Sequence, residues 1–353
     1  RIQAGSQVWK NPRIAVGQVA DPAPKDDEVI IQVGAVGICG SDMHVYHGHN
    51  PAQPPPEILG HEAAGVVVSG ERPGRRVAIN PIVSCSDCDV CRSGRQHLCR
   101  NRQVISRTPR PGAFAEFVRV PERNLFAVSD AMPMEMAALA EPFAVGYHAV
   151  GLGERAIHLP LAAAKVAVIG GGPIGLGTAQ ILQSRGTQNI LMAETSEARR
   201  ASINAAGRFG TYDPRGQSRP PAASIDLVID AYGGKSSREE AVRLVKNGGV
   251  IVHVGLSSGD GGVEYLHLTR SEISLLGSFA YTPVEFRETL DGLAAHGISG
   301  EPVSVTLGAT SERAFGMVVS ANYFDVLRTR MTLGRGFRAD EDVTPGEHPV
   351  VVV

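Results

Sequence analysis

A glycine-rich loop in the middle of the chain constrains its fold more than any other feature. Gly170-Gly171-Gly172-Pro173-Ile174-Gly175 follows the apolar run Val166–Ile169 and precedes a predicted helix over Ile174–Ser184. A Gly-x-Gly-x-x-Gly pattern is weak evidence alone, but between a strand and a helix it is the arrangement that dinucleotide binding requires. The glycines let the backbone approach a pyrophosphate, and the helix N-terminus offers free N–H groups.

The residues around this loop alternate between strand and helix patterns. We predict strands over 165–169, 189–193, 225–230, 249–254 and 273–278, and helices over 174–184, 196–206 and 237–245. This alternation favours an α/β fold with a doubly wound parallel sheet.

Residues 1–150 have a different pattern. Short apolar runs at Glu28–Val36, Ala63–Ser69, Arg76–Ile82 and Ala115–Val120 are separated by proline and glycine. They predict a small β-rich domain, followed by helical stretches over Met132–Leu139 and 145–152.

Composition excludes several classes of partner. Thirty-four Lys and Arg against 36 Asp and Glu give a net charge of -2, without the basic surplus of nucleic-acid or anionic-membrane binders. No signal peptide or membrane-length apolar run is evident, so we expect a cytoplasmic protein. The chain starts at Arg1 and ends on Val350–Val353, and we interpret it as a fragment open at both ends.

Four of the five cysteines lie close together, at Cys85, Cys88, Cys91 and Cys99. Four thiolates at this spacing can enclose one zinc tetrahedrally, with no position left for substrate. Two disulfides or unrelated thiols are alternatives, and an iron–sulfur cluster shares part of the spacing. We favour a structural zinc that stiffens the polar lobe 84–102.

A second group has the mixed character of a catalytic zinc shell, which keeps one position open. It contains Cys39, His61 and Glu62, with Glu141 before Pro142 near the fourth position. Each residue alone has an ordinary structural interpretation. Together with the separate cysteine lobe, they predict two zinc ions per chain.

These motifs resemble the zinc-dependent medium-chain dehydrogenases, in the branch of polyol, threonine and L-idonate dehydrogenases. The resemblance runs from residue 1 to about 300 and rests on Gly37–His44, Gly60–Gly65, the cysteine lobe, Glu141-Pro142 with Gly146–Ala149, and the glycine loop. It implies a GroES-like catalytic domain over 1–150 and a Rossmann NAD-binding domain over 151–300.

The resemblance also implies site residues. Cys39, His61 and Glu62 would bind the catalytic zinc, and Glu141 would bind it or hold its water, where classical alcohol dehydrogenases have Cys. Asp42 would orient the zinc-bound histidine.

The implied reaction is the oxidation of a secondary alcohol (a polyol, sugar alcohol or sugar acid) to a ketone, with hydride transfer to NAD. Zinc would favour loss of the alcohol proton. By resemblance, Ser41 takes this proton and His44 relays it outward, although a turn serine and a surface histidine are the alternatives. We interpret His47 and His49 as surface residues.

Cofactor choice depends on Glu194, about 20 residues beyond the glycine loop, where an acidic side chain binds ribose hydroxyls. This favours NAD over NADP. Arg199 and Arg200 would be placed to meet a 2′-phosphate, unless they form a solvated helix face. Val254-Gly255-Leu256 matches the segment that seats the nicotinamide in the family.

The substrate prediction rests on Gly277–Tyr281. Polyol and idonate members often carry Arg where this chain has Ala280, and that Arg touches substrate oxygens. We therefore expect a neutral polyol or secondary alcohol, with Tyr281 facing the pocket, and a homodimer or homotetramer. The alternative is a non-catalytic NAD-binding protein or an inactive chimera.

Residues 301–353 depart from the family pattern. Val318–Leu327 and Leu333–Phe337 resemble the periplasmic core domain of macrolide-export-type ABC transporter permeases. We predict a foreign fragment that leaves the catalytic domain without its closing elements; a diverged dehydrogenase C-terminus is the alternative. A transporter-associated module is disfavoured because no membrane segment separates the two parts.

Overall fold

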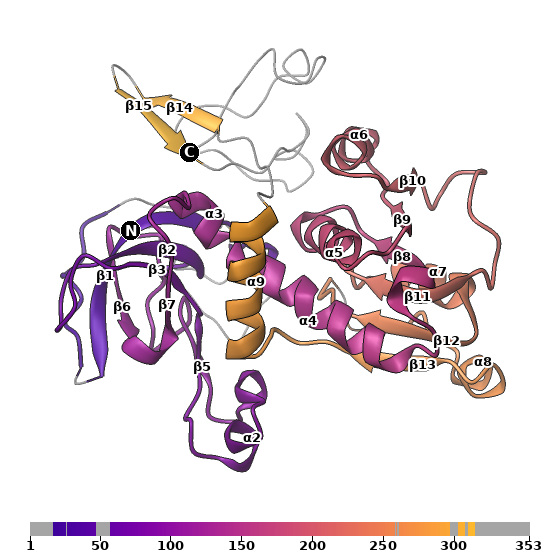
Figure 1. Cartoon of the computed structure of the whole chain (residues 1–353), viewed down its shortest axis with the longest axis horizontal. Helices are drawn as coiled ribbons and strands as arrows, with labels where there is room; N and C mark the ends of the chain where they lie inside the picture. Colours follow the sequence, from indigo (N-terminus) through magenta and orange to yellow (C-terminus); the bar gives the residue numbers. More distant parts are fainter. Residues whose placement is uncertain are drawn as a thin grey trace. The chain divides into compact units, whose positions relative to one another are not determined.

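The protein is described by a computed structural model that covers 17–25, 27–46, 57–257, 259, 261–296 and the backbone of 303–307 and 310–314. The chain divides into two compact units, 1–141 with 286–353, and 142–285. Figure 1 shows the elements of both units. The domain boundary predicted after residue 150 lies inside helix α4 (Ala140–Ala156). The predicted domain limits remain predictions.

The first unit is built on an antiparallel sheet with the strand order β6-β1-β2-β3-β7. Its strands are β1 (Glu28–Gly37), β2 (Glu62–Val67), β3 (Arg76–Ile79), β6 (Phe117–Pro121) and β7 (Leu125–Ala127). Alternate side chains such as Ile31, Val67 and Val77 form a buried apolar core. The helices of this unit include α1 (Gly40–Tyr46) and α3 (Met134–Ala138). The predicted β-rich fold of this segment is confirmed.

The cysteine lobe leaves this unit through a pair of short strands, β4 (Ile82–Val83) and β5 (Gln103–Val104), which are hydrogen-bonded to each other. Between them lie α2 (Asp89–Arg92) and the helical turn Gln96–Leu98. The lobe therefore leaves the first unit and returns to it at the same point, the β4–β5 pair.

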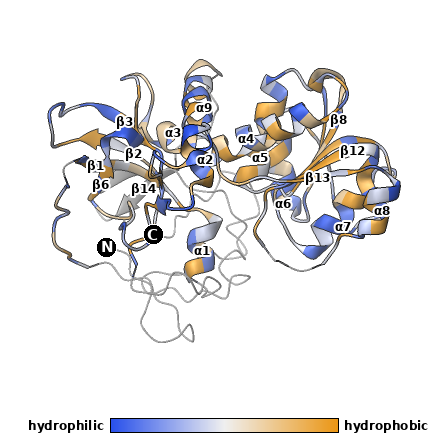
Figure 2. Ribbon diagram, turned by 90° about the horizontal axis from the view of Figure 1, so that it is seen from below, coloured by the Kyte–Doolittle hydropathy of each residue, from blue (hydrophilic) through white to orange (hydrophobic). Residues whose placement is uncertain are grey.

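The second unit contains six parallel strands in the order β10-β9-β8-β11-β12-β13. The strands are β8 (Lys165–Ile169), β9 (Asn189–Ala193), β10 (Gly210–Tyr212), β11 (Ile225–Asp230), β12 (Val245–His253) and β13 (Ser274–Gly277). The helices include most of α4, together with α5 (Pro173–Ser184), α6 (Glu197–Ala206), α7 (Lys235–Leu244) and α8 (Tyr265–Arg270). The strand order reverses between β8 and β11, which is where doubly wound sheets bind ligands. Figure 2 shows apolar strands covered by helices with polar outer faces. The predicted fold class is confirmed.

Several elements differ from the sequence-based expectation, among them β10 and β12. The short strand β10 was not predicted, because three residues give too little pattern to recognise. Strand β12 begins at Val245, which we expected to end a helix, because Val245 is buried in the core beside Ile225 and Leu244.

Helix α9 (Pro283–His296) continues from the second unit into the first. Phe286 packs on Phe126 with ring centroids 4.8 Å apart, and Arg287 Nη1 donates to the carbonyl of Ala127 at 3.1 Å. Beyond it, the backbone of β14 (Val303–Leu307) and β15 (Thr310–Ala314) forms an antiparallel pair. The motifs that predict a foreign tail, Val318–Leu327 and Leu333–Phe337, lie outside the described residues, so that origin remains a prediction.

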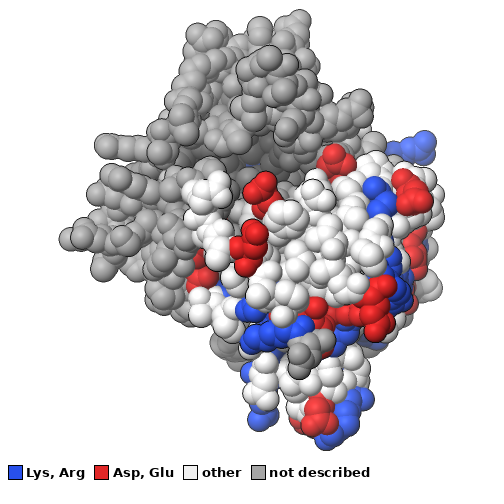
Figure 3. Space-filling view, turned by 90° about the vertical axis from the view of Figure 1, so that its left-hand side faces the viewer, with Lys and Arg blue, Asp and Glu red and all other residues white. Residues whose placement is uncertain are grey.

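Within the described part of the chain, none of the helices has the length and apolarity needed to cross a membrane. Figure 3 shows acidic and basic side chains next to each other on one face of the first unit. Ion pairs in this unit include Arg72 and Arg75 with Glu122, at 2.8 and 2.6 Å.

A buried carboxylate joins β10 to α7. Glu240 is 4% exposed; it accepts hydrogen bonds from the Tyr212 hydroxyl at 2.8 Å and from Arg243 at 2.7 and 2.8 Å. Arg219 also donates to it. These bonds outweigh the effect of burial and lower the pKa of Glu240.

We predict that Glu240→Gln lowers the free energy of unfolding by about 1–2 kcal/mol, because Tyr212 and two partly exposed arginines lose a buried charged acceptor. Glu239→Gln is the matched control: Glu239 pairs with Lys235 at 3.8 Å on the surface, and its loss should change stability by about 0.5 kcal/mol or less. Urea denaturation measures both variants. Equal midpoints for the two would contradict the prediction.

Candidate functional site

Three predicted zinc ligands meet at the edge of the first unit's sheet. Cys39 follows β1, and His61 and Glu62 stand at the start of β2. Their donor atoms all lie within 4.8 Å of one another. Gly37 pairs with Glu62 across the strands, and a Cβ on Gly37 would lie 2.1 Å from Glu62 Oε2. Only glycine leaves room there for the carboxylate.

Asp42 holds the segments that carry these ligands. It is 4% exposed, and its carboxylate accepts from the backbone N–H of Cys39 at 2.9 Å and of Gly60 at 3.3 Å. Its Oδ1 lies 3.6 Å from His61 Nδ1. Since Nδ1 faces Asp42, the other ring nitrogen of His61 is left for a metal.

Ser106 is a neighbour of this group that the sequence did not point to. Its Oγ lies 3.4 Å from His61 Nδ1, and its side chain is buried. Its backbone has φ 87°, a conformation that costs a non-glycine residue about 1–3 kcal/mol and is common near functional sites. No motif links residue 106 to residue 61, so only the fold brings them together.

The charges at this site favour a bound cation. Burial raises the pKa of Glu62 to about 8, and the nearby Glu141 carboxylate also raises it. Burial raises the pKa of the Cys39 thiol, while hydrogen bonds to Asp42 and Cys39 hold the pKa of His61 well above its usual value despite burial. A thiolate, an imidazole and a carboxylate form a donor set that suits zinc, whose charge offsets the repulsion between the acidic groups.

Glu141 lies beside this donor group rather than within it. It is 7% exposed in the first turn of α4, near enough for its charge to affect Cys39 and Glu62. Among the described residues, the group with donor atoms within 4.8 Å contains Cys39, His61 and Glu62 but not Glu141.

The proton-relay candidates are on α1. Ser41 and His44 are three residues apart and both partly exposed, so they lie on the same side of the helix. The backbone N–H of Ser41 donates to Cys39 Sγ at 3.5 Å. His47 and His49 lie outside the described residues.

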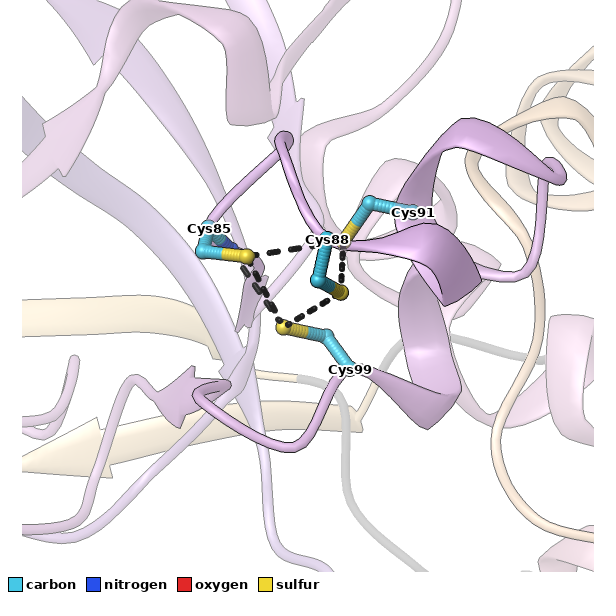
Figure 4. A group of neighbouring side chains, drawn as sticks. All are labelled: Cys85, Cys88, Cys91 and Cys99. Carbon is cyan, nitrogen blue, oxygen red and sulfur yellow. Dashed lines mark hydrogen bonds between the residues drawn. The ribbon is translucent and has the colours of Figure 1, made fainter.

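The other four cysteines form a separate cluster, shown in Figure 4. The Sγ–Sγ distances are 3.4 Å for Cys85–Cys99, 3.5 Å for Cys88–Cys91, and 3.9 Å for both Cys85–Cys91 and Cys88–Cys99. Four sulfurs about 2.3 Å from a central zinc would be about 3.8 Å apart in a regular tetrahedron. The cluster therefore fits a zinc, and its sulfurs are too far apart for the disulfide alternative.

In the second unit, the glycine loop has the geometry that its sequence predicts. Gly170 has φ 100°, and a Cβ on Gly175 would lie 1.8 Å from the Gly170 carbonyl oxygen. Gly172 is the N-cap of α5, with Pro173 in the first turn, and a Cβ on Gly172 would meet no atom within 4 Å. Ile174 follows in that turn. Gly170 and Gly175 are thus required by the fold, whereas Gly172 faces open space at the helix N-terminus.

Glu194 lies against this loop, directly after β9. Its Oε2 accepts from the Gly171 N–H at 2.9 Å and its Oε1 from the Ser196 N–H at 2.8 Å. Arg199 Nη1 is 3.9 Å from Glu194 Oε2. Arg200 donates to the Glu194 carbonyl at 2.7 Å and lies 3.7 Å from Asp213.

The predicted nicotinamide segment follows β12. Val254 is 8% exposed, and its N–H donates to the Asp230 carbonyl at 2.9 Å, whereas Leu256 is exposed. In the proposed substrate segment, Ala280 has φ 51° and Tyr281 is fully buried, at 0% exposure.

Comparison with known proteins places the chain in a family. Residues 25–130 match the alcohol dehydrogenase GroES-like domain, and residues 173–295 match the zinc-binding dehydrogenase domain. The chain belongs to the zinc-binding alcohol dehydrogenases. It is therefore a zinc-dependent, NAD-linked dehydrogenase, and the predicted family, enzyme class and cofactors are confirmed.

Several relatives of this dehydrogenase are known. It is 34% identical over 292 residues to L-galactonate-5-dehydrogenase of Escherichia coli K12, covering 79% of this chain and 82% of the relative. It resembles the structure of a putative zinc-binding dehydrogenase of Sinorhizobium meliloti 1021 bound to NADP (TM-score 0.75, 31% identity, 84% and 89% of the two chains). It also resembles the RspB dehydrogenase of E. coli CFT073 with NADH (TM-score 0.74, 29% identity, 83% and 87%).

We predict that Cys39→Ser and Cys88→Ser each remove one zinc, but with different consequences. Cys39→Ser should abolish turnover and leave NADH binding intact, because its site lies outside the second unit. Cys88→Ser should leave the catalytic zinc in place and unfold the lobe, since structural zinc contributes directly to folding. Metal analysis with NADH titration measures both. Loss of both zinc ions from either variant would contradict the separation of the sites.

We predict that Gly172→Ala folds normally but binds NADH about tenfold more weakly, because its methyl group would occupy the space where a pyrophosphate approaches. Gly175→Ala is the contrasting variant, in which the methyl group collides with the Gly170 carbonyl and should lower the melting temperature. Thermal melting and NADH titration distinguish the two effects. A destabilised Gly172→Ala protein, or one with unchanged NADH affinity, would oppose this assignment.

Proposed function

We propose that this dehydrogenase oxidises a secondary alcohol on a polyhydroxylated carbon chain to a ketone, with Cys39, His61 and Glu62 holding the catalytic zinc. The observation that carries the proposal is the mixed donor group, within 4.8 Å, beside the separate four-cysteine cluster. A structural zinc needs a closed shell, whereas three mixed ligands leave a position for a substrate oxygen.

Zinc at this site would supply Lewis acidity that makes the substrate hydroxyl a stronger acid. Asp42 keeps His61 in one orientation through Nδ1. Glu141 adds a second carboxylate beside the site and would bind the metal or hold a water there. Ser41 Oγ would accept the substrate proton while giving up its own hydroxyl proton, and His44, on the same side of α1, would take up the released proton and pass it to solvent.

NAD would accept the hydride. Gly170, Gly172 and Gly175 shape the turn for the pyrophosphate, while Pro173 and Ile174 begin the helix that offers its N–H groups. Glu194 would bind the adenosine ribose hydroxyls. Val254 would contact the nicotinamide half.

The similarity to a relative named L-galactonate-5-dehydrogenase supports a sugar-derived substrate. Ala280, which offers no positive charge to a carboxylate, favours a neutral polyol over a sugar acid. The function is tested by NADH formation with galactitol and L-galactonate, which differ in one end group, and with ethanol as the simple primary alcohol.

We expect turnover of galactitol or a related neutral polyol and little with ethanol. Preference for L-galactonate over galactitol would overturn only the proposal that the substrate is neutral, and not the proposed reaction. A zinc-loaded chain that binds NADH but oxidises none of these or related secondary alcohols would instead favour the alternative of a non-catalytic NAD-binding protein. The predicted homodimer or homotetramer and the cytoplasmic location remain predictions.

We predict that Ser41→Ala lowers kcat by about a hundredfold, because the proton loses its first acceptor. NADH affinity and zinc content should stay unchanged, since Ser41 is neither a predicted ligand nor part of the second unit. Stopped-flow measurement of hydride transfer tests this. If kcat changes less than about threefold, Ser41 is a turn residue and not part of the relay.

We predict that Glu194→Gln shifts the ratio of NAD to NADP affinity by about tenfold toward NADP. The variant keeps an acceptor oxygen but removes the charge that opposes a 2′-phosphate, and Arg199 is already 3.9 Å away. Glu197→Gln, an exposed neighbour in the first turn of α6, is the control. An unchanged ratio in Glu194→Gln would mean that Glu194 does not select the cofactor.

A further inference from the structure

Asp230 is a buried hydrogen-bonding centre that neither the motifs nor the proposed reaction uses. It ends β11 and is 0% exposed. Its Oδ1 accepts from the N–H groups of Tyr232 at 3.1 Å and Gly233 at 2.9 Å. Its Oδ2 accepts from Ser237 Oγ at 3.0 Å and lies 3.1 Å from His253 Nδ1.

These bonds join the loops that follow two neighbouring strands. Asp230 of β11 and His253 of β12 are partners in the parallel register, so the loops 231–234 and 254–257 leave the same edge of the sheet. The Asp230 carbonyl oxygen also accepts from the N–H groups of Val254 and Gly255, at 2.9 and 3.0 Å. One residue therefore holds both loops through its side chain and its backbone.

The two loops touch through their backbones. A Cβ on Gly233 would lie 2.0 Å from the Gly255 carbonyl oxygen, and a Cβ on Gly170 would lie 3.3 Å from Tyr232. Loop 231–234 is thus packed between the glycine loop that would bind the pyrophosphate and the segment that would seat the nicotinamide. A shift of Asp230 would move both parts of the cofactor site.

Asp230 also determines how His253 presents its ring. A carboxylate only accepts hydrogen bonds, so Nδ1 of His253 carries the proton and, in the neutral ring, Nε2 is an acceptor. The His253 side chain is 29% exposed, so part of the ring is accessible at this edge of the sheet. In this tautomer, Nε2 can accept a hydrogen bond from an N–H or O–H group.

We propose that Asp230 is a positioning residue for the dinucleotide and that His253 Nε2 accepts a hydrogen bond from the nicotinamide half, either its carboxamide amino group or its ribose hydroxyls. The inference rests on the proposed NAD site. Asp230 keeps loops 231–234 and 254–257 in register and holds His253 in the accepting tautomer. Asparagine at position 230 would present an amino group toward Ser237 and His253, and would force His253 to exchange its donor and acceptor nitrogens.

The test uses the zinc-loaded full chain, titrated with NADH and with ADP, which lacks the nicotinamide half. His253→Leu should weaken NADH binding about fivefold to tenfold and leave ADP binding unchanged. Asp230→Asn should weaken both ligands, because loop 231–234 borders the pyrophosphate loop. Asp226→Asn is the control: this carboxylate stands at the other end of β11, where it bonds the Lys165 N–H at 2.8 Å and Lys246 Nζ at 2.6 Å, and its loss should leave the affinity for both ligands unchanged.

Each outcome separates this inference from the proposed function. If the unaltered chain binds NADH but both Asp230→Asn and His253→Leu bind it equally well, Asp230 is merely structural and the inference is wrong. If His253→Leu weakens ADP and NADH equally, its contact is not with the nicotinamide half. If the unaltered chain binds neither ligand, the proposed function itself fails. Should Asp230→Asn not fold, His253→Leu still decides the question.

Discussion

The first unit depends on one constraint: several acidic side chains are enclosed together at one buried site. Cys39 and Glu62 approach each other within 4.8 Å, and Glu141 adds its charge beside them. Burial and mutual repulsion both oppose ionisation of these groups, so a bound cation would stabilise their charged forms. The Asp42 carboxylate accepts hydrogen bonds from the backbone N–H groups of Cys39 and Gly60, and so links the two segments that carry the proposed ligands.

The second unit depends instead on loops whose backbones approach one another closely. Gly175 lies against the Gly170 carbonyl, Gly170 lies against Tyr232, and Gly233 lies against Gly255, so the loops that follow β8, β11 and β12 pack closely on one another. Such packing leaves room for a dinucleotide but needs buried acceptors to fix the loops. Glu194 and Asp230 supply them, each accepting backbone N–H groups after a parallel strand.

The sequence was sufficient where local pattern decides structure. The strands Lys165–Ile169, Asn189–Ala193 and Ile225–Asp230 occur at the predicted residues, because each is a short apolar run bounded by turns. The proposed ligands Cys39, His61 and Glu62 were recognisable from their motifs, and their donor atoms lie together in the structure. Ser106 and Asp230 were not, since their roles arise from neighbours 45 and 23 residues away in the chain, and such contacts exist only after folding. Nor did the sequence show that α9 joins the first unit through Phe286.

The central claim is that the five cysteines are divided between a closed cluster of four and a mixed site with one. Zinc X-ray absorption spectroscopy of the metal-loaded chain tests this division directly. The account predicts two zinc ions that share five sulfur ligands, with the remaining ligands nitrogen or oxygen, so the average is between two and three sulfurs per zinc. A single zinc per chain with four sulfurs, or two zinc ions without any nitrogen or oxygen ligand, would contradict it.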